Sequence, residues 1–205
     1  MSGAATSDYF SPAMVNRERL VWTVATRRQL ERWEPLVAAS VLRGFEDRQL
    51  DDADIWAAQI EHHFALIAAR HLLQALELDP PTNVAVDPTL RAELKEGRDL
   101  HEHWLENVPV FNVSPRVKQP PRSSGRSFAA RNPDRAPYWW LGWSNKTGPT
   151  LLPNVSAPAV HGLLDAVEAE VLADDSALSP FVPPRAPSPW LHQDGEWWPK
   201  AGPCA

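Results

Sequence analysis

The chain has 205 residues, of which 43% are hydrophobic and 22% are charged, and this composition excludes a collagen, a disulfide-rich mini-protein and a chain that is disordered throughout. Its 20 basic and 26 acidic residues give a net charge of −6, which excludes a globally basic nucleic-acid binder. The single cysteine, Cys204, excludes an internal disulfide and suits a reducing compartment.

The N-terminal residues predict no signal peptide. Residues 1–11 contain neither the basic stretch nor the apolar stretch of a signal peptide, and we interpret them as a flexible N-terminus. No run in the chain approaches the ~18 consecutive apolar residues of a membrane-spanning helix. We therefore expect a cytoplasmic protein that makes no membrane contact.

The first helix signal is Pro12, which suits the first turn of a helix. Apolar residues near helical spacing predict that this helix runs over residues 13–33. Pro35 should end or kink it, because proline lacks a backbone N–H and its ring clashes with the preceding turn. Residues 36–45 then continue or restart the helix.

A second helix is predicted over residues 51–78. Three aspartates at positions 51, 52 and 54 mark its start, because carboxylates are stabilised beside the free N–H groups of a helix N-terminus. Asp79-Pro80-Pro81 ends it. Apolar residues occupy most of its circumference, so we expect a central, largely buried helix.

One polar stripe interrupts this second helix. At about 100° per residue, its members lie within roughly 60° of one another: Gln59, His63, Arg70 and Gln74. Polar groups on a buried helix need partners, which another helix, a ligand or a second subunit would supply. We take Gln59, His63 and Arg70 as candidate substrate-binding residues.

A third helix, from Asp87-Pro88 to about residue 107, carries the hexapeptide Arg98-Asp99-Leu100-His101-Glu102-His103. Here an arginine is followed by a polar residue and, five positions on, by a histidine. The pattern resembles the Arg-x4-6-His signature of HEPN-type helical proteins, many of which are metal-independent ribonucleases that act as dimers. The resemblance covers this hexapeptide and its helical setting over residues 50–107.

The resemblance implies a role for each residue. His103 would be the general acid and base at the ribose 2′-hydroxyl, and Arg98 would hold the scissile phosphate. Asp99, one turn before His103, would hydrogen-bond the imidazole and fix its tautomer. The alternative is a surface network, because Arg98 with Glu102 and Asp99 with His103 are also ordinary one-turn pairs.

The rest of the chain alternates loops with regular elements. Residues 113–137 are rich in Pro, Ser and Arg and are typical of an exposed loop. Residues 138–152 predict an aromatic β-hairpin with its turn at 144–148. An amphipathic helix follows over 157–173, with Ser156 as its N-cap.

Residues 174–205 form a tail rich in Pro and Trp, and from Ser179 onward we predict no regular structure. Disordered tails are usually poor in aromatic residues, so Trp190, Trp197 and Trp198 need an explanation. They either dock on a protein partner or cover a groove on the body of the protein itself.

Together these elements predict a mainly α protein, an antiparallel helical bundle over residues 12–173 with one short β-hairpin and a Pro/Trp-rich tail. The first functional hypothesis is an HEPN-like ribonuclease with Arg98, Asp99 and His103 as catalytic residues. The loop at 113–135, with six basic side chains and one acidic one, would contact RNA phosphates, and a homodimer would complete the site. The second hypothesis is a non-enzymatic protein that binds another macromolecule through its acidic bundle and its Trp-rich tail.

Histidines gather on the second and third predicted helices, at positions 62, 63, 71, 101 and 103. A helical bundle builds metal sites from such residues when their spacing is HExxH, ExxH or HxxxH, and none of these spacings is present. We therefore expect no metal site, and a metal-dependent bundle enzyme is the third functional hypothesis. Phosphate-binding loops and Rossmann glycines are absent from the sequence as well, so we expect no cofactor.

Overall fold

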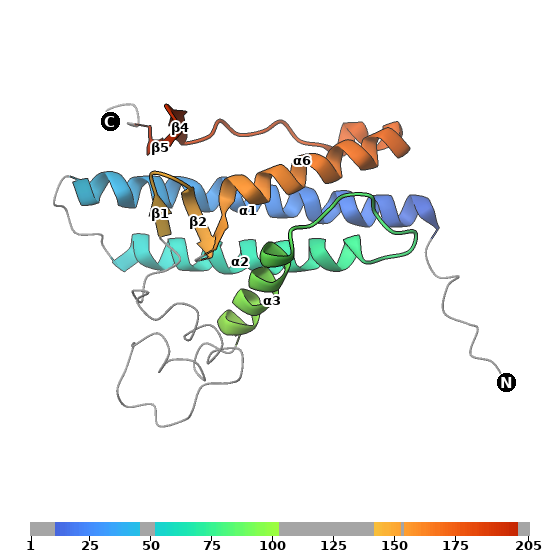
Figure 1. Ribbon diagram of the computed structural model, residues 1–205, viewed down its shortest axis with the longest axis horizontal. Helices are drawn as coiled ribbons and strands as arrows, with labels where there is room; N and C mark the ends of the chain where they lie inside the picture. The colour runs from blue at the N-terminus through green and yellow to red at the C-terminus, as the bar shows by residue number, and fades with distance from the viewer. Residues whose placement is uncertain (1–10, 46–51, 103–141, 153, 201–205) are drawn as a thin grey trace, which may run out of the picture.

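The computed structural model describes residues 11–45, 52–102, 142–152 and 154–200, with the helix but not the side chains described at 45, at 52 and over 96–102 (Figure 1). The elements in chain order are α1 (Pro12–Phe45), α2 (Asp52–Leu76), α3 (Pro88–Glu102), β1 (Gly142–Ser144), β2 (Gly148–Leu152), β3 (Val155–Ser156), α6 (Ala157–Asp174), the 3-10 helix η2 (Ser176–Phe181), β4 (Trp190–Gln193) and β5 (Glu196–Pro199). The protein is mainly helical, as predicted. The basic loop at 113–137, the first strand residues at 138–141 and residues 1–10 lie outside the described part.

We expected Pro35 to end or kink the first helix, and residues 36–45 to continue or restart it. Helix α1 runs through Pro35 to Phe45, so of these alternatives an end at Pro35 is wrong and a continuation of the helix is confirmed. Pro35 lies on the exposed side of α1, where water can bond the carbonyl that the missing N–H leaves free. Trp33 and Val37, on the opposite side, are fully buried and hold the helix on the core through this turn.

Three helices build the core of the protein. Helices α1 and α2 lie side by side along the long axis, and α6 lies against α1 (Figure 1). Trp22 stacks on His71 with ring centroids 4.3 Å apart, and Trp33 meets His62, so α1 and α2 run antiparallel. The short helix α3 packs on α2 through its buried residues Leu90 and Leu94.

One face of α2 is exposed, so the prediction of a largely buried helix is wrong for that face. Trp56, Ile60 and Phe64 are 62%, 50% and 49% exposed. They lie four residues apart and form an apolar stripe on the outer side of the helix. The opposite face packs into the core through buried apolar residues such as Ala58 and Leu66.

The predicted hairpin is present as β1 and β2, with its turn over residues 145–147, and β3 adds a third antiparallel strand to β2. Directly after β3, the side chain of Ser156 accepts a hydrogen bond from the backbone N–H of Ala159. This confirms Ser156 as the N-cap of α6, with Pro158 in the first turn.

The described part of the tail is ordered, so the prediction of no regular structure from Ser179 onward is wrong. Residues 176–200, here called the strap, form η2 and then the β4–β5 hairpin. The strap runs along the side of the bundle formed by α1 and α6 and ends beside β1 and β2 (Figure 1). Trp190 is buried and stacks against Trp143 of β1, so this tryptophan covers the protein's own body.

Gly148 lets the hairpin of β1 and β2 pack closely against Trp197 of the strap. It has a positive φ of 75°, and a Cβ at this position would lie 3.1 Å from a side-chain carbon of Trp197. We expect Gly148→Ala to lower the free energy of unfolding by about 2–4 kcal/mol, because it adds a steric clash to the cost of a left-handed alanine. Urea denaturation measures this loss.

Gly195 provides the matched control for that substitution. It has a φ of 80°, and open space surrounds the position of its Cβ. Gly195→Ala should therefore show the cost of the backbone conformation alone, about 1–2 kcal/mol. Equal losses for the two variants would contradict a tight contact between Gly148 and Trp197.

Candidate functional site

The Arg-x4-His hexapeptide lies at the end of α3. Arg98 and Asp99 are in the helix as predicted, and His103 follows its last residue and lies outside the described part of the chain. Helix α3 is fixed on the protein by Leu94, which is buried, and by Glu93, whose Oε1 accepts a hydrogen bond from Asn154 Nδ2 at 3.2 Å. The backbone that carries Arg98 is therefore held on the bundle at the N-terminal half of α3.

The predicted polar stripe lies on the outer side of α2 and not in the core. Gln59, His63 and Arg70 are all half-buried, on the side of the helix next to the apolar stripe of Trp56, Ile60 and Phe64. The ring of His63 also contacts that of Phe64. The structure thus brings the three predicted residues together on one face, beside an uncovered apolar surface.

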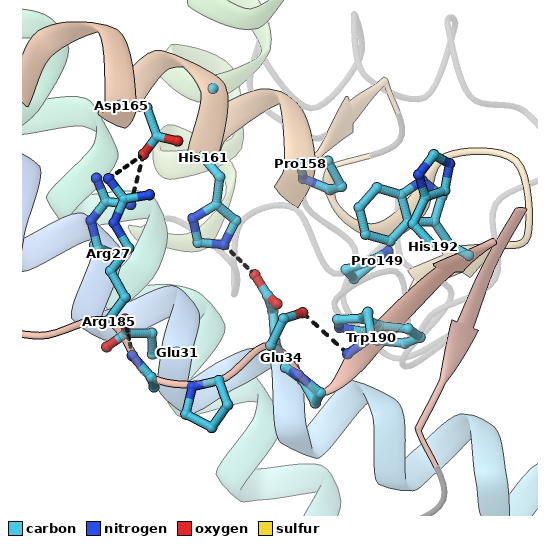
Figure 2. Close-up of a pocket in the computed structure, with 16 residues that line it drawn as sticks. Arg27, Glu31, Glu34, Pro149, Pro158, His161, Asp165, Arg185, Trp190 and His192 are labelled. Carbon is cyan, nitrogen blue, oxygen red and sulfur yellow. Dashed lines mark hydrogen bonds and ion pairs between the residues drawn. The ribbon is translucent and has the colours of Figure 1, made fainter. Parts of the chain in front are cut away.

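A second candidate site lies between α1, α6 and the strap, in a cavity of about 490 Å³ that we call the strap pocket (Figure 2). Helix α1 contributes Arg27, Glu31 and Glu34, and α6 contributes His161 and Asp165. The strap closes the cavity with residues 185–190, together with His192 and Trp197. Pro149 and Pro158 complete the apolar wall.

A buried carboxylate orients a histidine in this cavity. Glu34 is 5% exposed, and its Oε1 lies 2.6 Å from Nε2 of His161 (Figure 2). An ionised Glu34 accepts the Nε2–H, which leaves Nδ1 of a neutral imidazole as an acceptor. Within the described residues Nδ1 has no partner, so it is available to a ligand.

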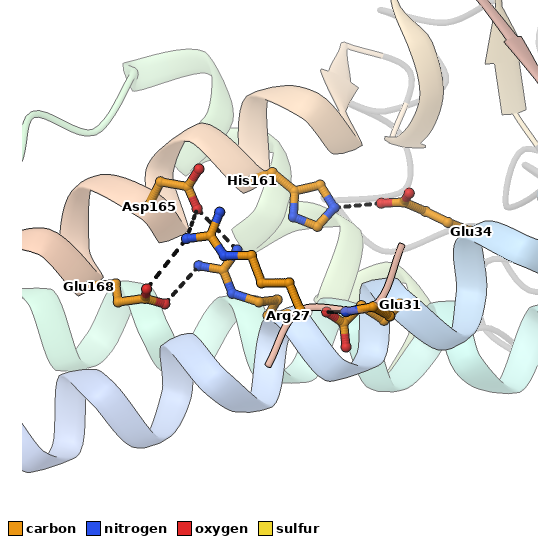
Figure 3. Close-up of polar contacts among 8 residues, drawn as sticks. Arg27, Glu31, Glu34, His161, Asp165 and Glu168 are labelled. Atoms are coloured by element: carbon orange, nitrogen blue, oxygen red, sulfur yellow. Dashed lines mark hydrogen bonds and ion pairs between the residues drawn. The ribbon is translucent and has the colours of Figure 1, made fainter. Parts of the chain in front are cut away.

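Four charged residues beside this pair join the helices to the strap (Figure 3). Buried Arg27 bonds Asp165 and Glu168 at 3.0 Å each. Arg185 of the strap bonds the same two carboxylates, at 3.0 and 3.3 Å. The pKa of Arg185 is raised: partial desolvation opposes its charge, but Asp165 and Glu168 together outweigh it.

One backbone contact fixes the strap over the cavity. The N–H of Ala186 donates a hydrogen bond to Oε1 of Glu31 at 3.0 Å. With the ion pairs of Arg185, this contact attaches the strap to α1 and to α6 at once. Specific hydrogen bonds and ion pairs therefore hold the outer wall of the strap pocket in place.

Sequence reasoning missed the strap pocket. His161 and Glu34 are 127 residues apart, and Arg27 and Asp165 are 138 residues apart, so no local spacing connects them. The one available signal was the tryptophan content of the tail, which indicated a groove without locating it.

Comparison with known proteins finds no matching family model, no similar curated protein and no similar solved structure. Among the described helices, none is long and apolar enough to cross a membrane. In the same part of the chain, His, Cys, Asp and Glu residues form no group of three that could hold a metal ion.

Proposed function

We propose that this protein is a metal-independent ribonuclease that resembles HEPN-type helical proteins. The observation that carries the proposal is that the arginine of the Arg-x4-His hexapeptide lies in a regular helix, α3, which packs on α2. The proposal assigns the phosphate to Arg98 and proton transfer at the ribose 2′-hydroxyl to His103, with Asp99 as the residue that orients the imidazole.

The outer face of α2 supports a substrate-binding role. Arg70 offers a guanidinium for a neighbouring phosphate, and Gln59 and His63 offer hydrogen bonds on the same side of the helix. The proposal includes RNA contacts by the loop at 113–135 and a homodimer that covers the apolar stripe of Trp56, Ile60 and Phe64. The interior of a dimer interface is typically apolar, as this stripe is.

Cleavage of total RNA and tRNA in EDTA tests this function, with wild type and His103→Ala compared. We expect the variant to cleave at least about 100-fold more slowly, because a general acid–base typically accelerates the chemical step by about 10²- to 10⁴-fold. The control is His101→Ala, which removes a neighbouring histidine that the proposal gives no role. Circular dichroism shows that each variant keeps its helices.

Two results would contradict the ribonuclease. One is a folded wild-type protein that cleaves neither RNA preparation. The other is His103→Ala with unchanged cleavage, which would assign the activity to a different residue or to a contaminant.

The second candidate is a non-enzymatic interaction protein, which the exposed apolar stripe of α2 favours. Trp190 is buried against the body, and Trp197 is half-buried, whereas Trp198 is 39% exposed. A protein partner for the tail would therefore contact Trp198 before the other two. For this candidate, size-exclusion chromatography with light scattering is the measurement, and Phe64→Glu should disrupt an assembly that uses the stripe.

A further inference from the structure

Two buried donors in the strap pocket have no hydrogen-bond partner among the residues that the structure describes. Arg27 is 4% exposed and Trp190 is 3% exposed, and both line the cavity. Arg27 uses its two terminal nitrogens for ion pairs. Within the described part of the chain, its Nε–H meets no acceptor, and neither does the Nε1–H of Trp190. A buried donor without a partner costs about 1–3 kcal/mol, so native structures rarely keep one unless water or a ligand bonds it.

These donors and His161 indicate what a ligand must present. Two N–H groups call for acceptor atoms, and Nδ1 of His161 calls for a donor or, if the ring is protonated, for a further acceptor. An organic cation has no acceptor on its charged group, so it fails to satisfy Arg27 and Trp190. The pocket is therefore suited to a molecule with carbonyl or ring-nitrogen acceptors.

The charges in the cavity wall disfavour an anion. Two arginines line the cavity, and both are already paired with carboxylates. Three carboxylates line it as well, those of Glu31, Glu34 and Asp165. With neutral imidazoles the wall thus has one negative charge in excess, which opposes a second negative charge at close range.

The remaining wall is apolar and rigid. Four prolines, at positions 149, 158, 187 and 189, line the cavity together with the rings of Trp190 and Trp197. A volume of about 490 Å³ lies within the range of small-molecule sites, which are mostly apolar with a few convergent polar groups. Flat side chains of this kind suit a planar ring.

We propose that the strap pocket binds an uncharged, planar small molecule that bears an amide or a heterocycle, with Arg27, Trp190 and His161 as its polar contacts. The site contains no residue of α3 and does not depend on ribonuclease activity. It joins residues of α1, α6 and the strap, so the ligand would also stabilise the strap in its docked position.

Three probes of nearly the same shape test this proposal: benzamide, benzoate and benzamidine. They are respectively neutral, anionic and cationic at neutral pH. NMR of the tryptophan indole N–H groups and the histidine rings follows each titration of the full chain. We expect benzamide to shift the Trp190 indole signal and His161 with a Kd in the millimolar range, which is ordinary for so small a ligand, and to bind more tightly than the two charged probes.

Variants connect the signals to the site. Trp190→Phe keeps an aromatic ring but removes the N–H, and should weaken benzamide binding about tenfold. Trp198→Phe is the matched control, because Trp198 does not line the cavity, and should leave the Kd unchanged. If Trp190→Phe fails to fold, His161→Gln at the half-buried His161 replaces it, with the same expected loss.

The outcomes separate clearly. Tightest binding of benzamide, lost in Trp190→Phe or His161→Gln, supports the proposal. Tightest binding of benzoate or benzamidine would overturn the assigned ligand class. No shift of Trp190 with any probe, or binding that both variants retain, would overturn the site itself.

Discussion

Replacement of Arg19 by methionine is expected to destabilise the protein by about 3–4 kcal/mol, among the largest losses from a single side chain in this fold. Arg19 is 3% exposed and lies in α1, from which its side chain reaches the C-terminal end of α2. Its Nε donates to the carbonyl of Ala75 at 3.3 Å, and its Nη2 donates to those of Leu78 and Pro80 at 3.1 and 2.5 Å. The last carbonyls of a helix have no partner within it, and Arg19 supplies a donor to one of them, Ala75, and to two carbonyls just beyond the end of α2.

Burial works against the charge of Arg19 without removing it. Desolvation lowers its pKa, while Glu170 and Asp174 of α6 act in the opposite direction. The guanidinium remains protonated because its ordinary pKa is so high. Methionine would occupy similar space, but the carbonyls of Leu78 and Pro80 would lose the donor that Arg19 supplies, and the carbonyl of Ala75 would keep only the N–H of Leu78 at 3.4 Å.

Urea denaturation of wild type, Arg19→Met and Arg28→Met measures the effect. Arg28 is an exposed arginine on the same helix with no partner among the described residues, so its loss should stay within about 0.5 kcal/mol. Similar losses for both variants would show that Arg19 does not act as a cap of α2.

Stability should also fall steeply in mild acid because of His62. This residue is fully buried, and burial is the largest of the causes that lower its pKa to about 4. Its Nε2–H donates to the carbonyl of Leu151 at 2.5 Å, which joins α2 to β2. In the folded protein the ring is therefore neutral at pH values where it is already charged in the unfolded chain.

The direction of the effect follows from proton uptake. Unfolding lets His62 titrate near 6.5, so below this value the unfolded state binds more protons than the native state. The contribution of His62 to the free energy of unfolding is therefore fully present above pH 6.5 and decreases as the pH falls toward 4. At 1.36 kcal/mol per pKa unit, the total decrease is up to about 3 kcal/mol. Below about pH 4 the contribution of this group becomes constant.

A non-titrating variant checks the assignment. In His62→Gln the amide can still donate to Leu151, and the slope of unfolding free energy between pH 6.5 and 4 should become shallower than in wild type. The control is His71→Gln, which removes an exposed histidine of the same helix and should retain the wild-type slope. A wild-type slope in His62→Gln would show that other groups cause the acid sensitivity.

The helices were predictable where local signals are strong. Pro12, the aspartates before residue 55 and Ser156 mark helix starts through bonds that form within one turn, and α1, α2 and α6 begin within about one residue of them. Pro35 does not end α1, because buried neighbours on the other side of the helix outweigh one lost hydrogen bond. Which face of α2 is covered depends on distant elements, and apolar residues occupy most of the circumference of this helix, so their pattern does not show which side stays exposed.

The strap shows a second reason why sequence-based prediction fails. Its proline content argued against regular structure, yet β4 and β5 need only a two-residue turn at Asp194 and Gly195, both of which adopt a positive φ. Contacts between segments far apart in the chain hold them: Trp190 stacks against Trp143, and the N–H of Trp197 donates a hydrogen bond to the carbonyl of Asn145 at 2.6 Å. The candidate residues Gln59, His63 and Arg70 were correctly grouped on one face, because that grouping depends only on helical geometry.

During synthesis, the strap pocket can form only after the helices that line it, because the strap is near the C-terminal end of the sequence. A nascent chain emerges with its N-terminal part first, so α1 and α2 can pair long before residue 185 has been made. Until then the α1 residues Arg27, Glu31 and Glu34 face water and lack their partners on α6 and the strap. A chain interrupted before residue 176 would contain α1 and α6 but lack the outer wall of the pocket, so the proposed ligand would bind only after the strap has been synthesised.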